Sequence, residues 1–529
     1  GLACANCTVE IFSDSGDEGG IYEGRTKSGE DGAFTFAKGA SLAGPNLTAT
    51  ATQTDGSTSE FSPPTQGSSQ NLNLQVGNAP PMFLQQTRPS NELADNRIGG
   101  TEEAQHIGPW LWNAGAKWMR VIVDPSGKWQ HVDWSKDEYV IDPNEEEAID
   151  NLVSNGLRIM LVLDVWYPES KVVDCQTESG IEIYSNWVRF MVRHFKGRVE
   201  YYEILNAPED FNTGPYGMPV EPYTYLVKRI APIIREEYPQ AKIVVGTVDT
   251  MLDVSRDWML RFLKSDAMPL VDGFSWHGMY GAAPSDDPRG VLGGGFAEHQ
   301  IANYWENYPA FVKEIKSTAT AHGFHGEFLA EEMIWRTPDL QGPFEPCCFT
   351  DVSAAKYTAR AIIIHLGLDV AVGLGETGDT GVVQRDYYIP RTNSVIRNLC
   401  TIMAGVQPIE LPIVIESEAG NIKHYGFSQS NGDFLVAVWR DDAAVDVDPG
   451  IASIITVPGF SNCNAAGMDV LNGFEQGLMT SNENGSLMIR DLLIKDYPLV
   501  IRLSATDPRV RALIRDRNQR RARRPHNSR

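Results

Sequence analysis

Residues 95–380 contain a series of short apolar runs that are separated by amphipathic stretches. The clear runs are 117–124, 158–165, 200–206, 241–246, 271–277, 326–332 and 369–375. Continuous apolar strands separated by helices are typical of a parallel sheet that helices cover. Residues 96–100 would supply one more strand, first in chain order. About eight such units in roughly 280 residues favour a closed (β/α)8 barrel, or TIM barrel, over an open sheet.

The segments on both sides of this region have the period-two alternation of half-buried strands. Residues 1–75 are rich in Thr, Ser, Gly and Asp, and they predict a small immunoglobulin-like β-sandwich that serves as an accessory module. Residues 391–505 contain a hairpin signal around 431–433 and predict a C-terminal β-sandwich. The predicted fold class is therefore α/β: a TIM barrel over 76–390 with a sandwich on each side.

The last segment, 506–529, carries many arginines and few apolar residues. A disordered basic tail is the expectation, and anchoring to a surface is the alternative.

Composition restricts the partners. The formal net charge is -24, which argues against a nucleic-acid partner because phosphate contacts need basic surface. No run of about 18 apolar residues occurs, so no membrane-spanning helix is expected. The chain starts at Gly1 without the pattern of a signal peptide, as a trimmed or mature chain would. We expect a secreted, extracellular bacterial protein.

The seven cysteines include two close pairs. Cys4 and Cys7 form a C-x-x-C with no second such pair and no nearby histidine, which disfavours zinc and favours a short disulfide or no bond. Cys347 and Cys348 are adjacent, so a vicinal disulfide is one alternative there. The sequence implies neither a metal nor a cofactor.

Polar and aromatic residues follow the predicted strands where each strand ends. The active sites of TIM barrels lie at this face, so these residues should line one cleft. They are Arg120, Asp164, Trp166, Asn206, His277, Tyr280, Glu331, Glu332 and Trp335. Aromatic rings suit the apolar faces of sugars, and carboxylates and histidine suit the hydroxyls. The composition of the cleft therefore predicts a glycan ligand.

Several of these residues also have structural interpretations. Arg120 could instead be a salt-bridge partner inside the barrel, and Glu203 has the strand parity to pair with it. Asp164 could cap a loop, and His277 could be a satisfied core histidine. Glu209 is expected to be solvated at a helix start. Glu376 follows the eighth strand, where it either faces substrate or only caps the chain end of that strand.

A specific resemblance lies in residues 184–209, whose strand ends in Glu-Ile-Leu-Asn-Ala-Pro. This segment resembles the helix and fourth strand of clan A glycoside hydrolases, most of all families 39 and 5, where the strand ends in Asn-Glu-Pro. In those enzymes the Asn holds the substrate 2-hydroxyl and the Glu is the general acid/base. Asn206 and Pro208 match this motif, whereas Ala207 occupies the acid/base position.

The resemblance extends over about 95–500 and places the nucleophile at the end of the seventh strand. Two carboxylates follow Ala330, and the spacing to Trp335 selects Glu332, with Glu331 as the alternative. Adjacent strand residues point to opposite sides. We therefore expect only one glutamate to face the barrel axis, and the other to pair with Arg336, Arg360 or solvent. Residues 274–280 resemble the sixth strand, whose His and Tyr line the sugar site.

The resemblance implies a retaining β-glycosidase that hydrolyses a plant or microbial oligosaccharide or polysaccharide by double displacement. Such a mechanism needs two carboxyls about 5–5.5 Å apart. Without the proton donor at 207, turnover should be severely impaired although glycan should still bind. Three hypotheses remain: a glutamate at 207 was replaced by design, the chain is a natural glycan-binding pseudoenzyme, or it is a surface adhesion protein.

Overall fold

The computed structural model describes residues 3–506 with gaps. The longer gaps are 37–45, 67–72, 124–129, 166–172, 210–216, 279–306, 336–348 and 376–389, and shorter ones fall within 15–35, 55–64, 79–81, 102–103, 135, 250–252 and 334. The chain divides into two compact units, Gly1–Asn73 and Leu74–Arg529. None of the described helices is long and apolar enough to cross a membrane.

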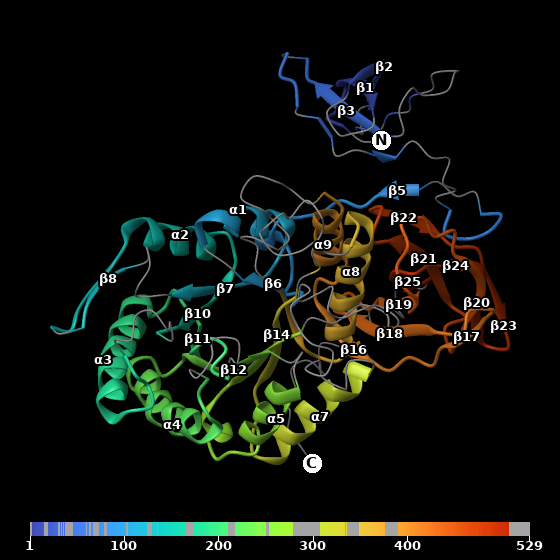
Figure 1. The fold of residues 1–529 in the computed structure, drawn as a ribbon. Helices are drawn as coiled ribbons and strands as arrows, with labels where there is room; N and C mark the ends of the chain where they lie inside the picture. The colour runs from blue at the N-terminus through green and yellow to red at the C-terminus, as the bar shows by residue number, and fades with distance from the viewer. Residues whose placement is uncertain are drawn as a thin grey trace. The chain divides into compact units, whose positions relative to one another are not determined.

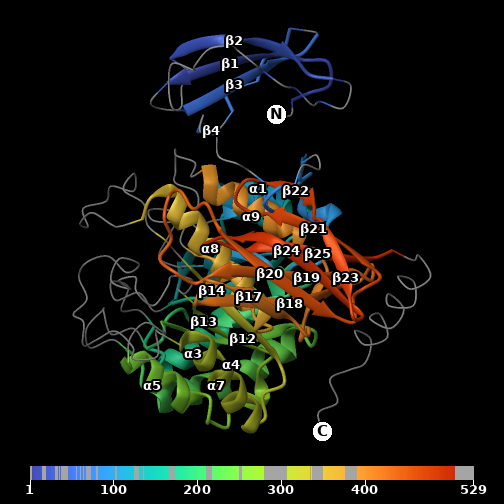
Figure 2. The same cartoon turned by 90° about the vertical axis from the view of Figure 1, so that its right-hand side faces the viewer.

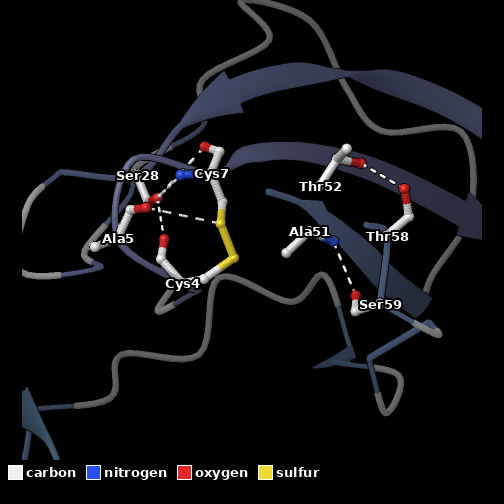
Figure 3. The surroundings of a disulfide bond; sticks show 8 residues. All are labelled: Cys4, Ala5, Cys7, Ser28, Ala51, Thr52, Thr58 and Ser59. Atoms are coloured by element: carbon white, nitrogen blue, oxygen red, sulfur yellow. Dashed lines mark hydrogen bonds between the residues drawn. A yellow bond between two sulfur atoms is a disulfide. The ribbon is translucent and has the colours of Figure 1, made fainter. Parts of the chain in front are cut away.

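The first unit is built on one four-stranded sheet of order β2-β1-β3-β4. The strands are β1 (Thr8–Asp14), β2 (Ile21–Lys27), β3 (Asn46–Thr52) and β4 (Thr65–Gln66). All of their pairings are antiparallel, and Val9 and Ile11 alternate with more exposed neighbours along β1. A disulfide joins Cys4 to Cys7 beside β1 (Figure 3), which is one of the two alternatives that the C-x-x-C spacing left open.

The second unit contains a closed barrel of eight parallel strands, as predicted (Figure 1). The strands in chain order are β6 (Ile98–Thr101), β7 (Trp118–Val123), β10 (Arg158–Leu163), β11 (Tyr201–Ile204), β12 (Lys242–Asp249), β13 (Gly273–His277), β14 (Glu327–Glu332) and β15 (Ala371–Leu374). The weak run at 96–100 is indeed the first strand, and it pairs with β15 to close the barrel. These strands are almost wholly buried because helices cover them outside.

The described helices of this unit are α1 (Ala104–Ala114), α2 (Pro143–Ser154), α3 (Glu178–Phe195), α4 (Val220–Glu237), α5 (Asp253–Phe262), α7 (Tyr308–Ala321), α8 (Asp351–Gly367) and α9 (Pro390–Ile402), with short 3-10 turns at Ser90–Glu92 and Met268–Leu270. Side-chain caps start several of them: Thr177 accepts a hydrogen bond from the Gly180 amide in α3, and Thr350 accepts one from the Ser353 amide in α8. A hairpin of β8 (Gln130–Asp133) and β9 (Glu138–Ile141) follows β7.

Two antiparallel sheets follow the barrel. One has the order β16-β18-β19-β25-β21-β22-β5 and the other β17-β20-β24-β23. Their strands are β5 (Met82–Leu84), β16 (Val406–Ile409), β17 (Val414–Ser417), β18 (Ile422–Gln429), β19 (Phe434–Arg440), β20 (Ile451–Pro458), β21 (Cys463–Asp469), β22 (Phe474–Gly477), β23 (Thr480–Glu483), β24 (Ser486–Ile494) and β25 (Leu499–Ala505). Apolar residues of both sheets share one core. In Figure 2 these sheets face the viewer.

Strand β5 lies within the range 76–390 predicted for the barrel, yet it adds to the edge of the seven-stranded sheet beside β22. Helix α8 connects the barrel to these sheets. Its buried Lys356 binds Asp496 at 2.7 Å, and Arg360 donates to the carbonyls of Asp442 and Asp496. The sheets thus hold in place the helix that follows β14. The basic tail over 507–529 lies outside the described residues.

Candidate active site

Arg120 in β7 is the centre of a buried polar cluster inside the barrel. Its guanidinium is fully buried, with Nε 2.6 Å from Glu203 Oε2 and Nη1 3.0 Å from Glu332 Oε1. The Nη2 atom donates to Asn206 Oδ1 at 2.7 Å. One planar cation therefore joins the ends of β11 and β14, at the positions predicted from the strand ends. Because Arg120 is fully buried, the alternative interpretation as an interior salt-bridge partner fits its position.

Glu203 in β11 is fully buried and pairs with Arg120, as strand parity predicted. Its second oxygen, Oε1, accepts hydrogen bonds from the hydroxyls of Thr247 in β12 and Ser275 in β13, the latter at 2.8 Å. Three donors from three strands thus converge on this carboxylate, which is the arrangement that stabilises a buried anion.

Glu331 and Glu332 end β14, and both face Arg120. The Nε atom of Arg120 lies 3.6 Å from Glu331 Oε2 and its Nη1 atom lies 3.0 Å from Glu332 Oε1. The prediction that they point to opposite sides is wrong because the register of β13 and β14 shifts there: Trp276 is opposite Ala330, and His277 is opposite Glu332. An irregularity of this kind re-aims side chains.

The cation found beside Glu331 is not one of those predicted for it. Arg360 binds the C-terminal sheets, Arg336 lies outside the described residues, and Arg120 is the cation beside Glu331. Burial, then the Glu203 carboxylate, raises the pKa of Glu331 well above its ordinary value, although Arg120 acts in the other direction. The same carboxylates stabilise the charged form of Arg120. Burial lowers the pKa of Arg120, but Glu203, Glu331 and Glu332 raise it by more.

Glu332 is the more accessible of the two glutamates, with 8% of its side chain exposed against none for Glu331. The Nε2 atom of His277 lies 3.6 Å from Glu332 Oε1, so the two side chains are neighbours, as the sequence predicted for His277 and the carboxylate at the end of β14. The backbone also fixes this strand end: the Gly278 amide donates to the Glu332 carbonyl, and the Thr101 hydroxyl donates to the Glu331 carbonyl.

The Asn206-Ala207 turn lies directly after β11. Leu205 and Ala207 have φ angles of 62° and 38°, in the left-handed region that side chains with a Cβ seldom adopt. Backbone outliers of this kind concentrate at functional sites, where surrounding structure holds them. Here Asn206 is held through its side chain by Arg120, and the half-buried methyl of Ala207 occupies the next position.

Three other residues from the sequence predictions are buried. Asp164 is buried among groups that include Cys175 and Tyr184. Trp335 is only 5% exposed and packs near Tyr357 of α8, so it belongs to the core. Glu209 is 1% exposed, which contradicts the solvated helix start expected for it. Trp166, Tyr280, Glu376 and the Cys347–Cys348 pair lie outside the described residues.

Ser275 and Thr247 were not predicted from the sequence as part of the site. Ser275 has the strand parity of His277 and could have been found by it. Thr247 could not, because the pairing of β12 with β13 shifts between Val245 and Val248 and both Gly246 and Thr247 have positive φ. Within the described part of the chain, no group of three metal-binding side chains is arranged to hold an ion.

Glu332 is the carboxylate of this cluster that can act as a nucleophile, because its side chain is partly accessible. Arg120 and His277 lie beside it. Asn206 is tied to the same guanidinium and can present its amide to a hydroxyl of a ligand. Position 207, beside Asn206, holds only the methyl group of Ala207.

Comparisons with known proteins give a fold but no family. No protein-family model matches the chain, and no curated protein sequence matches it. A family 39 glycoside hydrolase from the gut symbiont Bacteroides cellulosilyticus WH2 has a similar structure, with a TM-score of 0.57 and 13% identity over 95% of this chain and 96% of that chain.

Two further structures are less similar. A glucosidase from Croceicoccus marinus has a TM-score of 0.49 at 14% identity, covering 80% of this chain and 98% of its own. The catalytic domain of GH30 xylanase C from Talaromyces cellulolyticus has a TM-score of 0.49 at 11% identity with the same coverage. The likeness to the family 39 enzyme, at 13% identity, shows the fold alone, and the fold shared is a closed barrel of eight parallel strands with antiparallel sheets beside it.

Proposed function

We propose that this chain is a clan A-type retaining β-glycosidase that acts on a plant or microbial oligosaccharide or polysaccharide outside the cell. Its acid/base position is occupied by Ala207, so it turns substrate over poorly as it stands. The observation that carries the proposal is the single guanidinium of Arg120, which binds Glu332 at the end of β14 and Asn206 at the end of β11.

Each residue then has a role in double displacement. Glu332 attacks the anomeric carbon, and Arg120 and His277 hold its carboxylate in place. Asn206 binds the 2-hydroxyl of the sugar, where hydrogen bonds strengthen in the transition state. A carboxyl at position 207 would protonate the leaving oxygen and later activate water, and Ala207 does neither.

Ala207 also supports a second candidate, in which the chain binds glycan without hydrolysing it. The buried Glu209 is no replacement for the missing acid, because 1% exposure leaves its carboxyl without access to a leaving group. The remainder of the Asn-x-Pro motif and the cluster around Arg120 are intact, which favours a single replacement in a working enzyme over the gradual decay of a pseudoenzyme. A surface adhesion protein is the third alternative.

The test restores the carboxyl. Ala207→Glu should raise the hydrolysis of aryl β-glycosides with poor leaving groups by about 10²–10⁴-fold, because only those need the proton. Substrates with good leaving groups should gain far less. Ala207→Gln is the matched control, since it has the size of glutamate without its proton, and should give no gain. Equal gains on both classes of substrate would count against an acid/base role for position 207.

A second measurement uses the space at Ala207 directly. On activated substrates, added azide should speed the Ala207 chain by entering as a small nucleophile, and the product should be a β-glycosyl azide. The Ala207→Glu substitution fills this space and should remove the acceleration. Glycan binding without any hydrolysis in the Ala207→Glu variant would favour the binding protein.

A further inference from the structure

Glu331 is a second buried carboxyl beside the proposed nucleophile, and the double displacement does not use it. Its side chain is fully buried, and 3.6 Å separate its Oε2 atom from Arg120 Nε. Neither of its carboxyl oxygens receives a hydrogen bond from a donor group in the described structure. A buried carboxylate without donors is costly, whereas a buried carboxylic acid needs only one acceptor for its proton.

The hydrogen-bond donors around the three carboxyl groups indicate which of them are ionised. Glu203 accepts from Arg120 Nε at 2.6 Å and from the hydroxyls of Thr247 and Ser275, so it has the environment of an anion. Glu332 accepts from Arg120 Nη1 at 3.0 Å. Arg120 thus already serves two carboxylates, which outnumber its single positive charge, and a third carboxylate would add negative charge that no described cation balances.

Among the described residues, the charged groups that act on Glu331 agree with this assignment. Arg120 from β7 is the one cation beside it among the described residues, whereas Glu203 from β11 and Glu332 from its own strand are acidic. Tyr223 from α4 is a neutral neighbour. Burial and the two carboxylates raise the pKa of Glu331, and a hydrogen bond with the Glu203 carboxyl adds to the rise. The two carboxyls share the Nε atom of Arg120, at 2.6 Å from Glu203 Oε2 and 3.6 Å from Glu331 Oε2.

We propose that Glu331 is a positioning residue that stays protonated when the protein is folded, donates its proton to Glu203, and so leaves the Nη1 edge of Arg120 to hold Glu332 as a carboxylate. The effect on Glu332 rests on the proposed function, whereas the location of the proton does not. The register shift at the end of β14 serves this arrangement, because it brings both glutamates to the same guanidinium.

The location of the proton is tested by unfolding. An acid that keeps its proton when folded and loses it when unfolded makes the unfolding constant rise about tenfold per pH unit above its ordinary pKa. Glu331→Gln removes this contribution and keeps the shape of the acid. The ratio of unfolding constants, original chain over variant, should therefore grow about tenfold per pH unit between pH 5 and 7. Glu327→Gln, at an exposed carboxyl of the same strand, is the matched control.

Glu203→Gln separates the two members of the pair. It removes the anion to which Arg120, Thr247 and Ser275 donate, so it should raise the unfolding constant at every pH. If instead Glu203→Gln gives the growing ratio and Glu331→Gln destabilises the fold, the proton is on Glu203 and the proposal is wrong. Failure of Glu331→Gln to fold would also overturn it, because an amide can replace an acid but cannot replace a carboxylate.

The effect on Glu332 is tested by the pH profile of kcat/KM in the Ala207→Glu background. Its acid limb should stay in place on Glu331→Gln, since the charge around Glu332 is unchanged. A shift of that limb to lower pH would show that Glu331 is ionised, and would contradict the proposal. If Ala207→Glu hydrolyses no glycoside, the proposed function fails, and the unfolding measurements still decide where the proton is.

Discussion

Arg120→Met is the perturbation that tests the buried cluster most severely. Methionine keeps much of the aliphatic stem of arginine and removes the guanidinium. The change would leave Glu203 and Glu332 without their cation, at positions where the side chains are 0% and 8% exposed. Removing one partner of a buried ion pair costs about 3–5 kcal/mol, and here one guanidinium serves two carboxylates. We expect a loss near the upper end, about 5 kcal/mol.

Equilibrium unfolding in urea, followed by tryptophan fluorescence, measures this loss. Arg158→Met is the matched control on the neighbouring strand β10, because Arg158 pairs with Asp95 at 2.9 Å while both side chains are partly exposed. Exposed pairs contribute about 0–1 kcal/mol. The loss in Arg120→Met should also shrink as the pH falls from 7 to 5, because the stranded carboxylates can then take up protons. Equal losses in both variants, or a loss independent of pH, would show that the guanidinium of Arg120 does not stabilise two buried carboxylates.

Three further predictions concern the supports of the barrel. Lys356→Met should cost about 3–5 kcal/mol by leaving the buried Asp496 alone, and Asp496→Leu in the same chain should recover most of it, as measured by urea midpoints. Gly278→Ala would place a Cβ 2.7 Å from that of Ala330, so it should cost about 1–3 kcal/mol and lower the thermal midpoint. Burial lowers the pKa of His365 to about 4. The folded state therefore keeps His365 neutral, and stability should fall by about 3 kcal/mol as the pH drops from 6.5 to 4, a loss that His365→Gln should remove.

The sequence predicted the barrel because its strands are buried on both sides and therefore form continuous apolar runs. It also predicted the pairing of Arg120 with Glu203, since both residues lie inside regular strands where parity holds. Parity failed at Glu331, because the register shift there depends on how β13 pairs with β14 and not on the sequence of β14 alone.

Other features depend on residues far apart in the chain. Strand β5 pairs Leu84 with Phe474, and no local pattern identifies a partner at such a separation. Trp335 was expected in the cleft because it follows a strand, yet the packing of α8 makes it part of the core. The proposal that position 207 is the acid/base position comes from the motif alone, because Asn206 and Pro208 bracket Ala207, and it stays a prediction.

The residue on which a covalent glycosyl-enzyme forms identifies the nucleophile directly. The Ala207→Glu variant would be treated with activated 2-fluoroglycosides of several sugars, whose intermediates hydrolyse slowly, and its peptides would be sequenced by mass spectrometry. We predict the label on Glu332, its loss in Glu332→Gln because an amide cannot attack the anomeric carbon, and its persistence in Glu331→Gln. A label on Glu331 would contradict the assignment of the nucleophile and of the buried proton together.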